Sequence, residues 1–177
     1  MILVSILGLV PDMDRVLEIC KKYNVILIED ACESFGSKFE NKNLGSFGAM
    51  GSFSTYFGHH LSTIEGGIIT TDDTDLYNIL KSIRSHGWDR DMDEEYQNTL
   101  RDKHQVNEFE NLYKFYYFGF NVRSSDLGAF LGINQLKKAL EMCKKRNENY
   151  KFYREKIVNP YWSPKDKENC YVSNFSY

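Results

Sequence analysis

The chain has 177 residues, and 42% of them are hydrophobic, which supplies a core for one ordinary domain and excludes a disordered or collagen-like protein. Lys and Arg number 22 against 25 Asp and Glu, so a net charge of −3 excludes the concentrated basic face that nucleic-acid binding needs. No apolar run approaches the roughly 18 residues of a membrane span. The four cysteines lie far apart without a CxxC pair, which favours reduced thiols in a cytoplasmic protein.

The hydrophobic pattern predicts strands that alternate with helices. Residues 1–7 and 25–28 are predicted strands around a helix over 12–23, and the second strand is expected to be buried on both faces. Further along the chain the pattern predicts strands over 51–56 and 67–71, a helix over 73–85, a long surface excursion over 88–111 and a long helix over 125–156. The apolar stripe expected to face inward on the long helix is Leu127, Phe130, Leu131, Ile133, Leu136 and Leu140. This order predicts an α/β domain with a mostly parallel sheet.

Two acids follow the strand predicted at 25–28. Glu29 and Asp30 would lie at the carboxyl edge of the sheet, where α/β proteins bind ligands. By position alone, the plainer reading is that these acids solvate a loop. His59 and His60 stand in a Ser, Thr and Gly-rich turn, but adjacent histidines without HxH or HxxxH spacing are a weak metal signal, and no metal site is predicted.

Five motifs in order along the chain resemble one protein family. They are Ile-Glu-Asp-Ala-Cys-Glu-Ser (28–34), Gly-Ser-Phe-Gly (45–48), the block from Phe53 to Gly67 that ends in Glu-Gly-Gly, Arg-Ser-His-Gly-Trp (84–88) and Gly-Phe-Asn-Val-Arg (119–123). Together they resemble the DegT-type sugar aminotransferases, which use pyridoxal phosphate on the aspartate-aminotransferase (type I) fold. The resemblance implies that the chain is α/β and forms part of the large domain of that fold, with a mostly parallel sheet flanked by helices.

One departure points to a branch of this family. Its ordinary members carry a lysine six residues before the Glu of Glu-Gly-Gly, where it holds the cofactor covalently. Here that position is His59, and no lysine occurs between Lys42 and Lys81. The exchange resembles the pyridoxamine-phosphate-dependent sugar 3-dehydratases. It implies C3 dehydration of a nucleotide-linked 4-keto-6-deoxysugar, with GDP-4-keto-6-deoxymannose favoured, in the synthesis of 3,6-dideoxysugars such as colitose for O-antigen, and with L-glutamate as the amino donor.

The resemblance also implies a role for individual residues. His59 would be the catalytic base, because an imidazole titrates near neutral pH and cannot hold the cofactor covalently. Asp30 would pair with the pyridine nitrogen, Ser54 would contact the phosphate, and Glu33 would touch the ring or its hydroxyl. Asn121 would reach the cofactor phosphate of a partner subunit in a homodimer with shared sites. His60, Glu65 and Arg123 are motif positions without an assigned role.

Plain alternatives stand beside four of these roles. His59 could mark a decayed aminotransferase, Ser54 a buried strand serine, Asn121 a turn residue and Glu33 an exposed loop acid. For the whole chain the alternatives are a nucleotide-sugar aminotransferase relative and a non-catalytic pseudoenzyme.

Family members are longer than this chain. The resemblance implies that residues 1–124 are the C-terminal part of the cofactor-binding large domain, 125–157 a connecting helix, and 158–177 the start of a truncated small domain. We therefore expect the isolated chain to have weak or no activity. The nucleotide and the sugar are not determined by these residues.

Overall fold

The computed structural model describes residues 1–157 and 167–176. They form two compact units, Met1–Thr70 with Ser125–Tyr177, and Thr71–Ser124. The second unit ends at Ser124, which is one of the two domain boundaries predicted from the resemblance, 124 and 157, whereas it begins at Thr71, where no boundary was predicted. Residues 158–166 and 177, which belong to the predicted small-domain entrance, lie outside the described residues.

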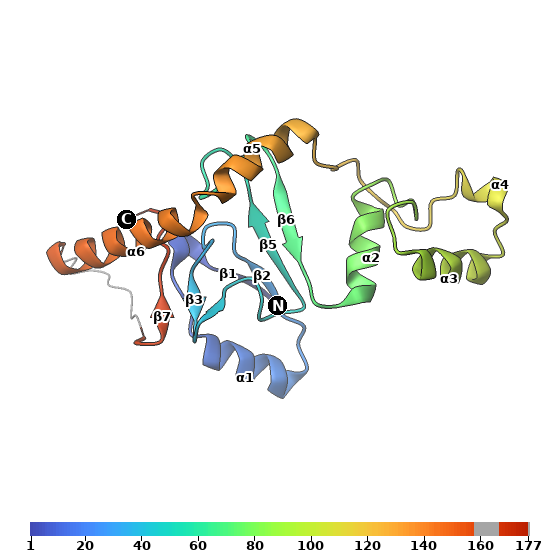
Figure 1. Ribbon diagram of the computed structural model, residues 1–177. Helices are drawn as coiled ribbons and strands as arrows, with labels where there is room; N and C mark the ends of the chain where they lie inside the picture. The colour runs from blue at the N-terminus through green and yellow to red at the C-terminus, as the bar shows by residue number, and fades with distance from the viewer. Residues whose placement is uncertain (158–166, 177) are drawn as a thin grey trace. The chain divides into compact units, whose positions relative to one another are not determined.

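A four-stranded sheet is the centre of the first unit (Figure 1). Its order is β1 (Ile2–Val4), β2 (Ile28–Asp30), β5 (Met50–Ser54) and β6 (Gly67–Thr70). The first three strands are parallel, and β6 pairs with β5 antiparallel, so the predicted mostly parallel sheet is confirmed. A second, antiparallel sheet joins β4 (Lys42–Asn43), β3 (Lys38–Phe39) and β7 (Cys170–Tyr171). Strands β3 and β4 are short and lie between the predicted strands over 25–28 and 51–56.

The first helix begins where its capping residue predicts. Helix α1 (Met13–Tyr23) starts after Asp12, whose carboxylate accepts from the Arg15 amide at 3.4 Å. It ends at Asn24, which adopts the left-handed conformation with φ 51°. Its buried Met13 forms a core with Phe39 and Leu44, so α1 and the small sheet share apolar contacts.

The strand expected to be buried on both faces is not. Strand β2 begins only at Ile28, and Ile26 keeps 69% of its surface exposed. The Val25 amide still bonds to the Cys20 carbonyl to close the end of α1, so the chain reaches the sheet later than its apolar run suggests. A turn of 3₁₀ helix, η1 (Ile6–Gly8), likewise shortens the strand predicted over 1–7.

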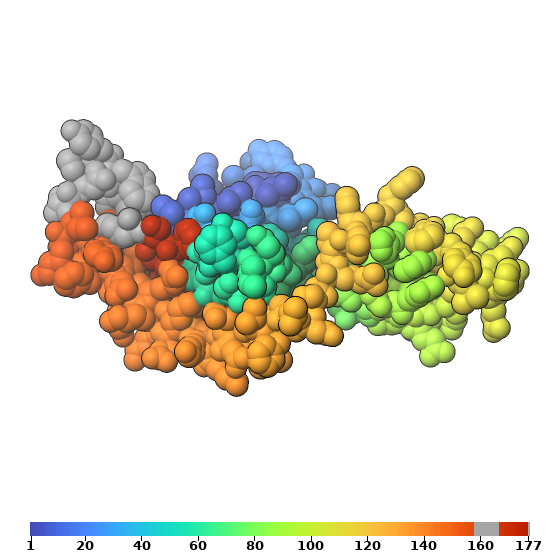
Figure 2. All heavy atoms as spheres, turned by 90° about the horizontal axis from the view of Figure 1, so that it is seen from above, coloured from blue at the N-terminus to red at the C-terminus, as the bar shows by residue number. Residues whose placement is uncertain are grey.

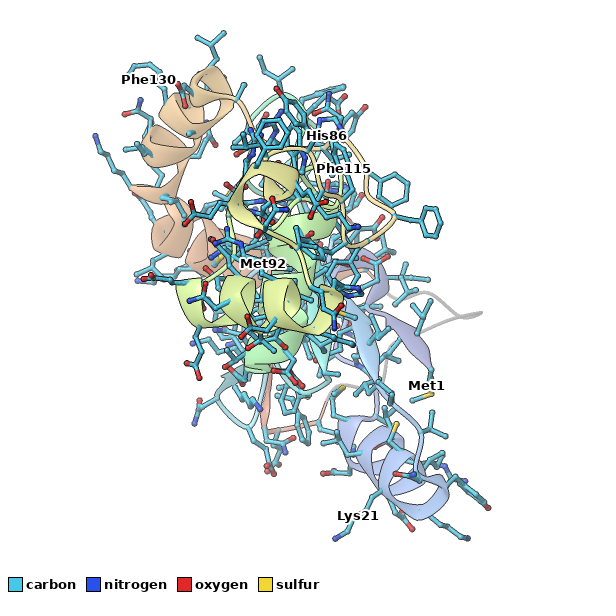
Figure 3. All side chains as sticks on the ribbon, turned by 90° about the vertical axis from the view of Figure 1, so that its right-hand side faces the viewer. Met1, Lys21, His86, Met92, Phe115 and Phe130 are labelled. Atoms are coloured by element: carbon cyan, nitrogen blue, oxygen red, sulfur yellow. The ribbon has the colours of Figure 1, made fainter. Side chains whose placement is uncertain are left out.

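The predicted long helix is two helices, α5 (Asp126–Leu136) and α6 (Ala139–Lys156). They meet at a tight turn in which the Lys138 amide bonds to the Gln135 carbonyl. The inward stripe predicted for this helix was also wrong, because its six apolar residues are 37% to 88% exposed. Figure 2 shows α5 and α6 (orange) at the surface along one edge of this unit, and Figure 3 shows Phe130 at the outside of α5. Small residues turn inward instead, with Gly128 and Gly132 against Thr63, while α6 buries Ala139 and Cys143.

The second unit contains three helices among its residues 71–124, which are all described. Helix α2 (Thr74–Ile83) starts at Asp73, whose carboxylate accepts from two backbone amides of the first turn. Helices α3 (Glu94–His104) and α4 (Glu108–Asn111) occupy the predicted surface excursion. The buried carboxylate of Asp89 pairs with Arg101 of α3 at 3.1 Å and so fixes that helix within the unit.

Candidate active site at the carboxyl edge of the sheet

The carboxyl ends of two parallel strands bring the main predicted residues to one edge. Strands β2 and β5 run in register, with Ile28 opposite Met50 and Asp30 opposite Ser52. Asp30 ends β2 and Ser54 ends β5. His59 follows in the loop between β5 and β6. The structure therefore places Asp30, Ser54 and the His59 loop at the carboxyl edge of the sheet, the edge where parallel sheets bind ligands.

His59 stands in a mainly aromatic setting. Its backbone amide bonds to the Tyr56 carbonyl at 3.0 Å. The Tyr56 ring meets the imidazole edge-on at 5.7 Å between centroids, and the Phe175 ring does so at 5.3 Å. The imidazole Nδ1 is buried, and it has no hydrogen-bond partner among residues 1–157 and 167–176. Two aromatic rings therefore flank the His59 imidazole, and its Nδ1 is left without a partner in the described part of the chain.

His60, next in the chain, has a structural role. It is 4% exposed, and its Nε2 lies 3.0 Å from the Ser173 carbonyl, to which it donates in the neutral tautomer. Burial lowers the pKa of His60 to about 4, and the Ser173 bond opposes this shift. The Arg146 and His59 charges lower this pKa as well, while the Glu33 carboxylate raises it. His60 is therefore neutral at physiological pH.

This burial makes stability depend on pH. The unfolded chain binds a proton at His60 from about pH 6.5 downward, whereas the folded chain does so only near pH 4. The free energy of unfolding should then fall as pH drops through this window, by at most about 1.4 kcal/mol per pH unit. Urea unfolding at pH 7.0 and 5.0 measures the fall. The His60→Asn variant should show a flatter dependence, and an equal slope in both proteins would contradict this role.

Asp30 is half-buried, and one of its carboxylate oxygens already accepts a hydrogen bond within its own turn. Its Oδ1 accepts from the Cys32 amide at 3.1 Å, which fixes the carboxylate direction. Burial raises the pKa of the Cys32 thiol to about 11, and the Asp30 carboxylate adds to that rise. Cys32 is therefore a protonated thiol at neutral pH and is no nucleophile.

Glu29 has a role that sequence reasoning missed. It is 1% exposed, and its carboxylate accepts from three backbone amides, those of Gly45 (2.7 Å), Phe47 (2.5 Å) and Gly48 (2.8 Å). It thus ties the Gly-Ser-Phe-Gly loop to β2. The two adjacent acids divide their tasks because successive strand residues point to opposite faces. Glu29 secures the fold, and Asp30 stays at the edge.

Two further predicted residues make local bonds. The Glu33 carboxylate accepts from the Leu7 amide at 2.7 Å and so supports a left-handed Leu7 with φ 56°. The Ser54 hydroxyl accepts from the Tyr56 amide at 3.2 Å. Each residue keeps further hydrogen-bonding capacity, since a carboxylate and a hydroxyl accept more than one bond. Their cofactor contacts stay predictions.

Asn121 and Arg123 lie in the second unit, and both are exposed. Asn121 forms an isolated bridge with Ser85, and the His86 amide bonds to the Phe120 carbonyl at 2.8 Å. The Arg-Ser-His-Gly-Trp and Gly-Phe-Asn-Val-Arg motifs therefore lie side by side. Gly87 is required there, because a Cβ on it would stand 1.9 Å from the Tyr117 carbonyl oxygen. Figure 3 shows His86 and Phe115 in this part of the unit.

Residues 173–175, near the end of the described chain, contact both His59 and His60. Arg146 of α6 donates to the carbonyls of Asn174 and Phe175 at 2.9 and 3.0 Å, and the Phe175 amide bonds to the Leu7 carbonyl. These bonds place Phe175 against His59 and Ser173 against His60. No local signal in the sequence could have indicated this, because the contact joins distant parts of the chain.

The donor set fits a pyridoxal-type cofactor. A half-buried carboxylate, a hydroxyl at a strand end and a partnerless imidazole nitrogen are groups that suit a pyridine nitrogen, a phosphate and a transferable proton. Across residues 1–157 and 167–176, no group of three or more His, Cys, Asp or Glu side chains could hold a metal ion. No helix in the same part of the chain is long and apolar enough to span a membrane.

Most of this chain is similar in sequence to known proteins. Residues 1–163 match the model of the DegT/DnrJ/EryC1/StrS aminotransferase family. GDP-4-keto-6-deoxy-D-mannose 3-dehydratase of Yersinia pseudotuberculosis is 38% identical over 152 residues, which are 86% of this chain and 38% of that protein. The chain therefore spans well under half the length of this relative.

Solved structures give the same result for the fold. The Escherichia coli GDP-4-keto-6-deoxy-D-mannose-3-dehydratase with bound hydrated PLP superposes with a TM-score of 0.85 at 36% identity, over 98% of this chain and 44% of that one. A GDP-4-keto-6-deoxymannose-3-dehydratase with a trapped PLP-glutamate geminal diamine gives 0.80 at 35% identity, over 97% and 44%. The predicted fold, part of the large domain of the type I aminotransferase fold, is confirmed.

Proposed function

Since the chain belongs to the DegT/DnrJ/EryC1/StrS aminotransferase family, we propose that its complete gene product is a sugar 3-dehydratase that works with pyridoxamine phosphate. The substrate is a nucleotide-linked 4-keto-6-deoxysugar, with GDP-4-keto-6-deoxymannose as the first choice. One observation carries the proposal. The loop at the carboxyl edge presents His59 where the aminotransferases of this family carry lysine, and no lysine lies between Lys42 and Lys81.

Each site residue has a task in this proposal. Pyridoxamine phosphate, when bound, supplies an amine for the sugar ketone and a ring that withdraws electrons. Asp30 keeps the pyridine nitrogen protonated, because a carboxylate in hydrogen-bond reach favours the charged form. Ser54 donates to the phosphate, and Glu33 orients the ring. His59 would take the proton from the cofactor's C4′ carbon and return it to the C3 hydroxyl of the sugar, which would then leave as water.

The absence of an amino group on His59 explains the choice of reaction. A lysine could deliver a proton to C4 of the sugar and complete an amino transfer, whereas an imidazole accepts the C4′ proton and leaves elimination as the productive step. L-glutamate then restores the amine of the cofactor. The solved relative with a trapped PLP-glutamate geminal diamine supports glutamate in this role.

The proposal also includes an oligomeric state and a cellular location. Asn121 is exposed and accessible to a second copy, which supports a homodimer in which it reaches the partner's cofactor phosphate. The scattered cysteines Cys20, Cys32 and Cys143 carry free thiols, which supports a reducing, cytoplasmic setting. Nucleotide sugars for O-antigen and related lipopolysaccharide are the proposed use of the product.

Product analysis tests this function. The complete gene product is incubated with pyridoxal phosphate, L-glutamate and GDP-4-keto-6-deoxymannose, and the sugar is followed by NMR and mass spectrometry. We expect the 3-deoxy-4-keto sugar with release of ammonia. A 4-amino sugar would instead favour the aminotransferase alternative. No conversion, together with no binding of the cofactor, would favour the pseudoenzyme.

A further inference from the structure

The hydroxyl groups of Thr55 and Thr63 hold the two sides of the loop that carries His59 together. Thr55 follows β5 and is 7% exposed, and its Oγ1 lies 2.7 Å from Oγ1 of Thr63. Thr63 Oγ1 also lies 3.0 Å from the Glu65 carbonyl, while its amide donates to the Thr55 carbonyl at 2.8 Å. A hydroxyl has one hydrogen, so Thr55 donates to Thr63 when Thr63 donates to Glu65. Thr63 thus joins the end of β5 to the far side of the loop.

The residue that follows Thr63 is in an unfavourable backbone conformation. Ile64 has φ 73°, in the left-handed region that β-branched residues avoid. Such a conformation persists only where its surroundings hold it. The Thr63 hydroxyl bonds to the carbonyl beyond Ile64, and the Ile64 amide bonds to the Ser62 hydroxyl at 3.2 Å. Hydroxyl groups therefore hold this turn on both sides.

The same turn sets the backbone of His59. The Ile64 carbonyl accepts from the Phe57 amide at 2.9 Å, and the His59 amide bonds to the Tyr56 carbonyl, one residue before Phe57. A change at Ile64 would move residues 56–59 with it. Gly66 shows how closely the hydroxyl pair fits, because a Cβ there would stand 2.5 Å from Thr55 Oγ1 and 2.7 Å from Thr63 Oγ1.

Helix α5 holds Thr63 from outside. Figure 1 shows α5 passing the end of β5, where this loop begins. A Cβ on Gly132 would lie 3.2 Å from Thr63 Cγ2, a tight contact, whereas a Cβ on Gly128 would meet Thr63 only at ordinary distances of 3.8 Å. Gly132→Ala would therefore push against Thr63, whereas Gly128→Ala would not. The two variants form a matched pair.

We infer that Thr63 is a positioning residue that holds His59 in place for proton transfer through its hydroxyl, with Gly132 as the support behind it. The inference rests on the proposed function for its effect on turnover. Its structural part, the placement of the His59 ring, does not depend on the cofactor. A Thr63→Val variant keeps the shape of the side chain and removes the hydroxyl, and Thr63→Ser keeps the hydroxyl.

Histidine-labelled NMR of the complete gene product, without added cofactor, tests the placement. His86 and His104 in the second unit serve as internal references. In Thr63→Val and Gly132→Ala we expect the ring signals of His59 to shift and broaden while the reference signals stay. In Thr63→Ser and Gly128→Ala they should remain at wild-type positions. Unmoved His59 signals in both Thr63→Val and Gly132→Ala would overturn the inference. If Thr63→Val does not fold, the result for Gly132→Ala alone decides.

Kinetics add a second readout. With GDP-4-keto-6-deoxymannose as substrate, Thr63→Val should lower kcat by about 10- to 100-fold and change KM less than about twofold, because a small misplacement of a reacting group affects the chemical step. Thr63→Ser should restore most of kcat. A Thr63→Val kcat within about twofold of wild type would count against the inference. A wild-type protein without turnover would refute the proposed function, and the NMR comparison would still decide the role of Thr63.

Discussion

The His59→Asn variant is expected to lose about 10²- to 10⁴-fold in kcat for sugar dehydration, the range that a positioned general base contributes. Asparagine is similar in size and polar, so it can stand between the Tyr56 and Phe175 rings that hold the imidazole. It cannot take a proton at neutral pH. The effect should fall on kcat with little change in KM, since the lost interaction acts in the transition state.

Single-turnover mixing of the cofactor-loaded protein with sugar measures this loss apart from product release. The matched control is His104→Asn on α3, where the imidazole is exposed and lies against the Tyr116 ring. The control should keep wild-type kcat. A His59→Asn variant that retains more than about a third of wild-type kcat would show that another group removes the proton.

Glu29→Ala should give the largest loss of stability of any single change considered for this fold, about 3–5 kcal/mol in the free energy of unfolding. The substitution leaves the amides of Gly45, Phe47 and Gly48 without their acceptor, and each unsatisfied buried donor costs about 1–3 kcal/mol. Water entering the space would recover part of this, so the total stays below the sum. The loop over residues 45–48 should loosen first.

Urea unfolding followed by circular dichroism measures the change through its midpoint. Glu18→Ala on the exposed side of α1 is the matched control, and it should shift the free energy of unfolding by less than about 0.5 kcal/mol. Glu29→Gln keeps the shape and one acceptor oxygen, so its loss should be intermediate. Equal stabilities of Glu29→Ala and Glu18→Ala would contradict the assigned role of Glu29.

Local features of the fold were predictable from the sequence because their causes are local. The capping aspartates Asp12 and Asp73 start α1 and α2 as their positions indicate. Strand and helix alternation predicted the parallel strands β1, β2 and β5, and with them the edge that gathers Asp30, Ser54 and the His59 loop. The departure at residue 59 was visible because a motif with many matching neighbours surrounds it.

The features that the sequence did not predict depend on contacts between residues that are distant in the chain. Which face of α5 turns inward was not predictable from hydrophobicity, because Gly128 and Gly132 allow a close approach to Thr63 that larger side chains would prevent. The roles of Glu29 and His60 were missed for the same reason. A buried carboxylate shows its purpose only when the amides of residues 45–48 reach it, and His60 only when Ser173 returns to it.

The most direct test of the central claim, that an imidazole in place of lysine makes this site a dehydratase, is the product ratio of the wild type and the His59→Lys variant. Both proteins receive pyridoxal phosphate, L-glutamate and GDP-4-keto-6-deoxymannose, and NMR counts the 3-deoxy-4-keto and 4-amino sugars. The account predicts the deoxy sugar from the wild type, and from His59→Lys a loss of that product with a gain of the amino sugar. The same product ratio from both proteins would show that residue 59 does not decide the reaction.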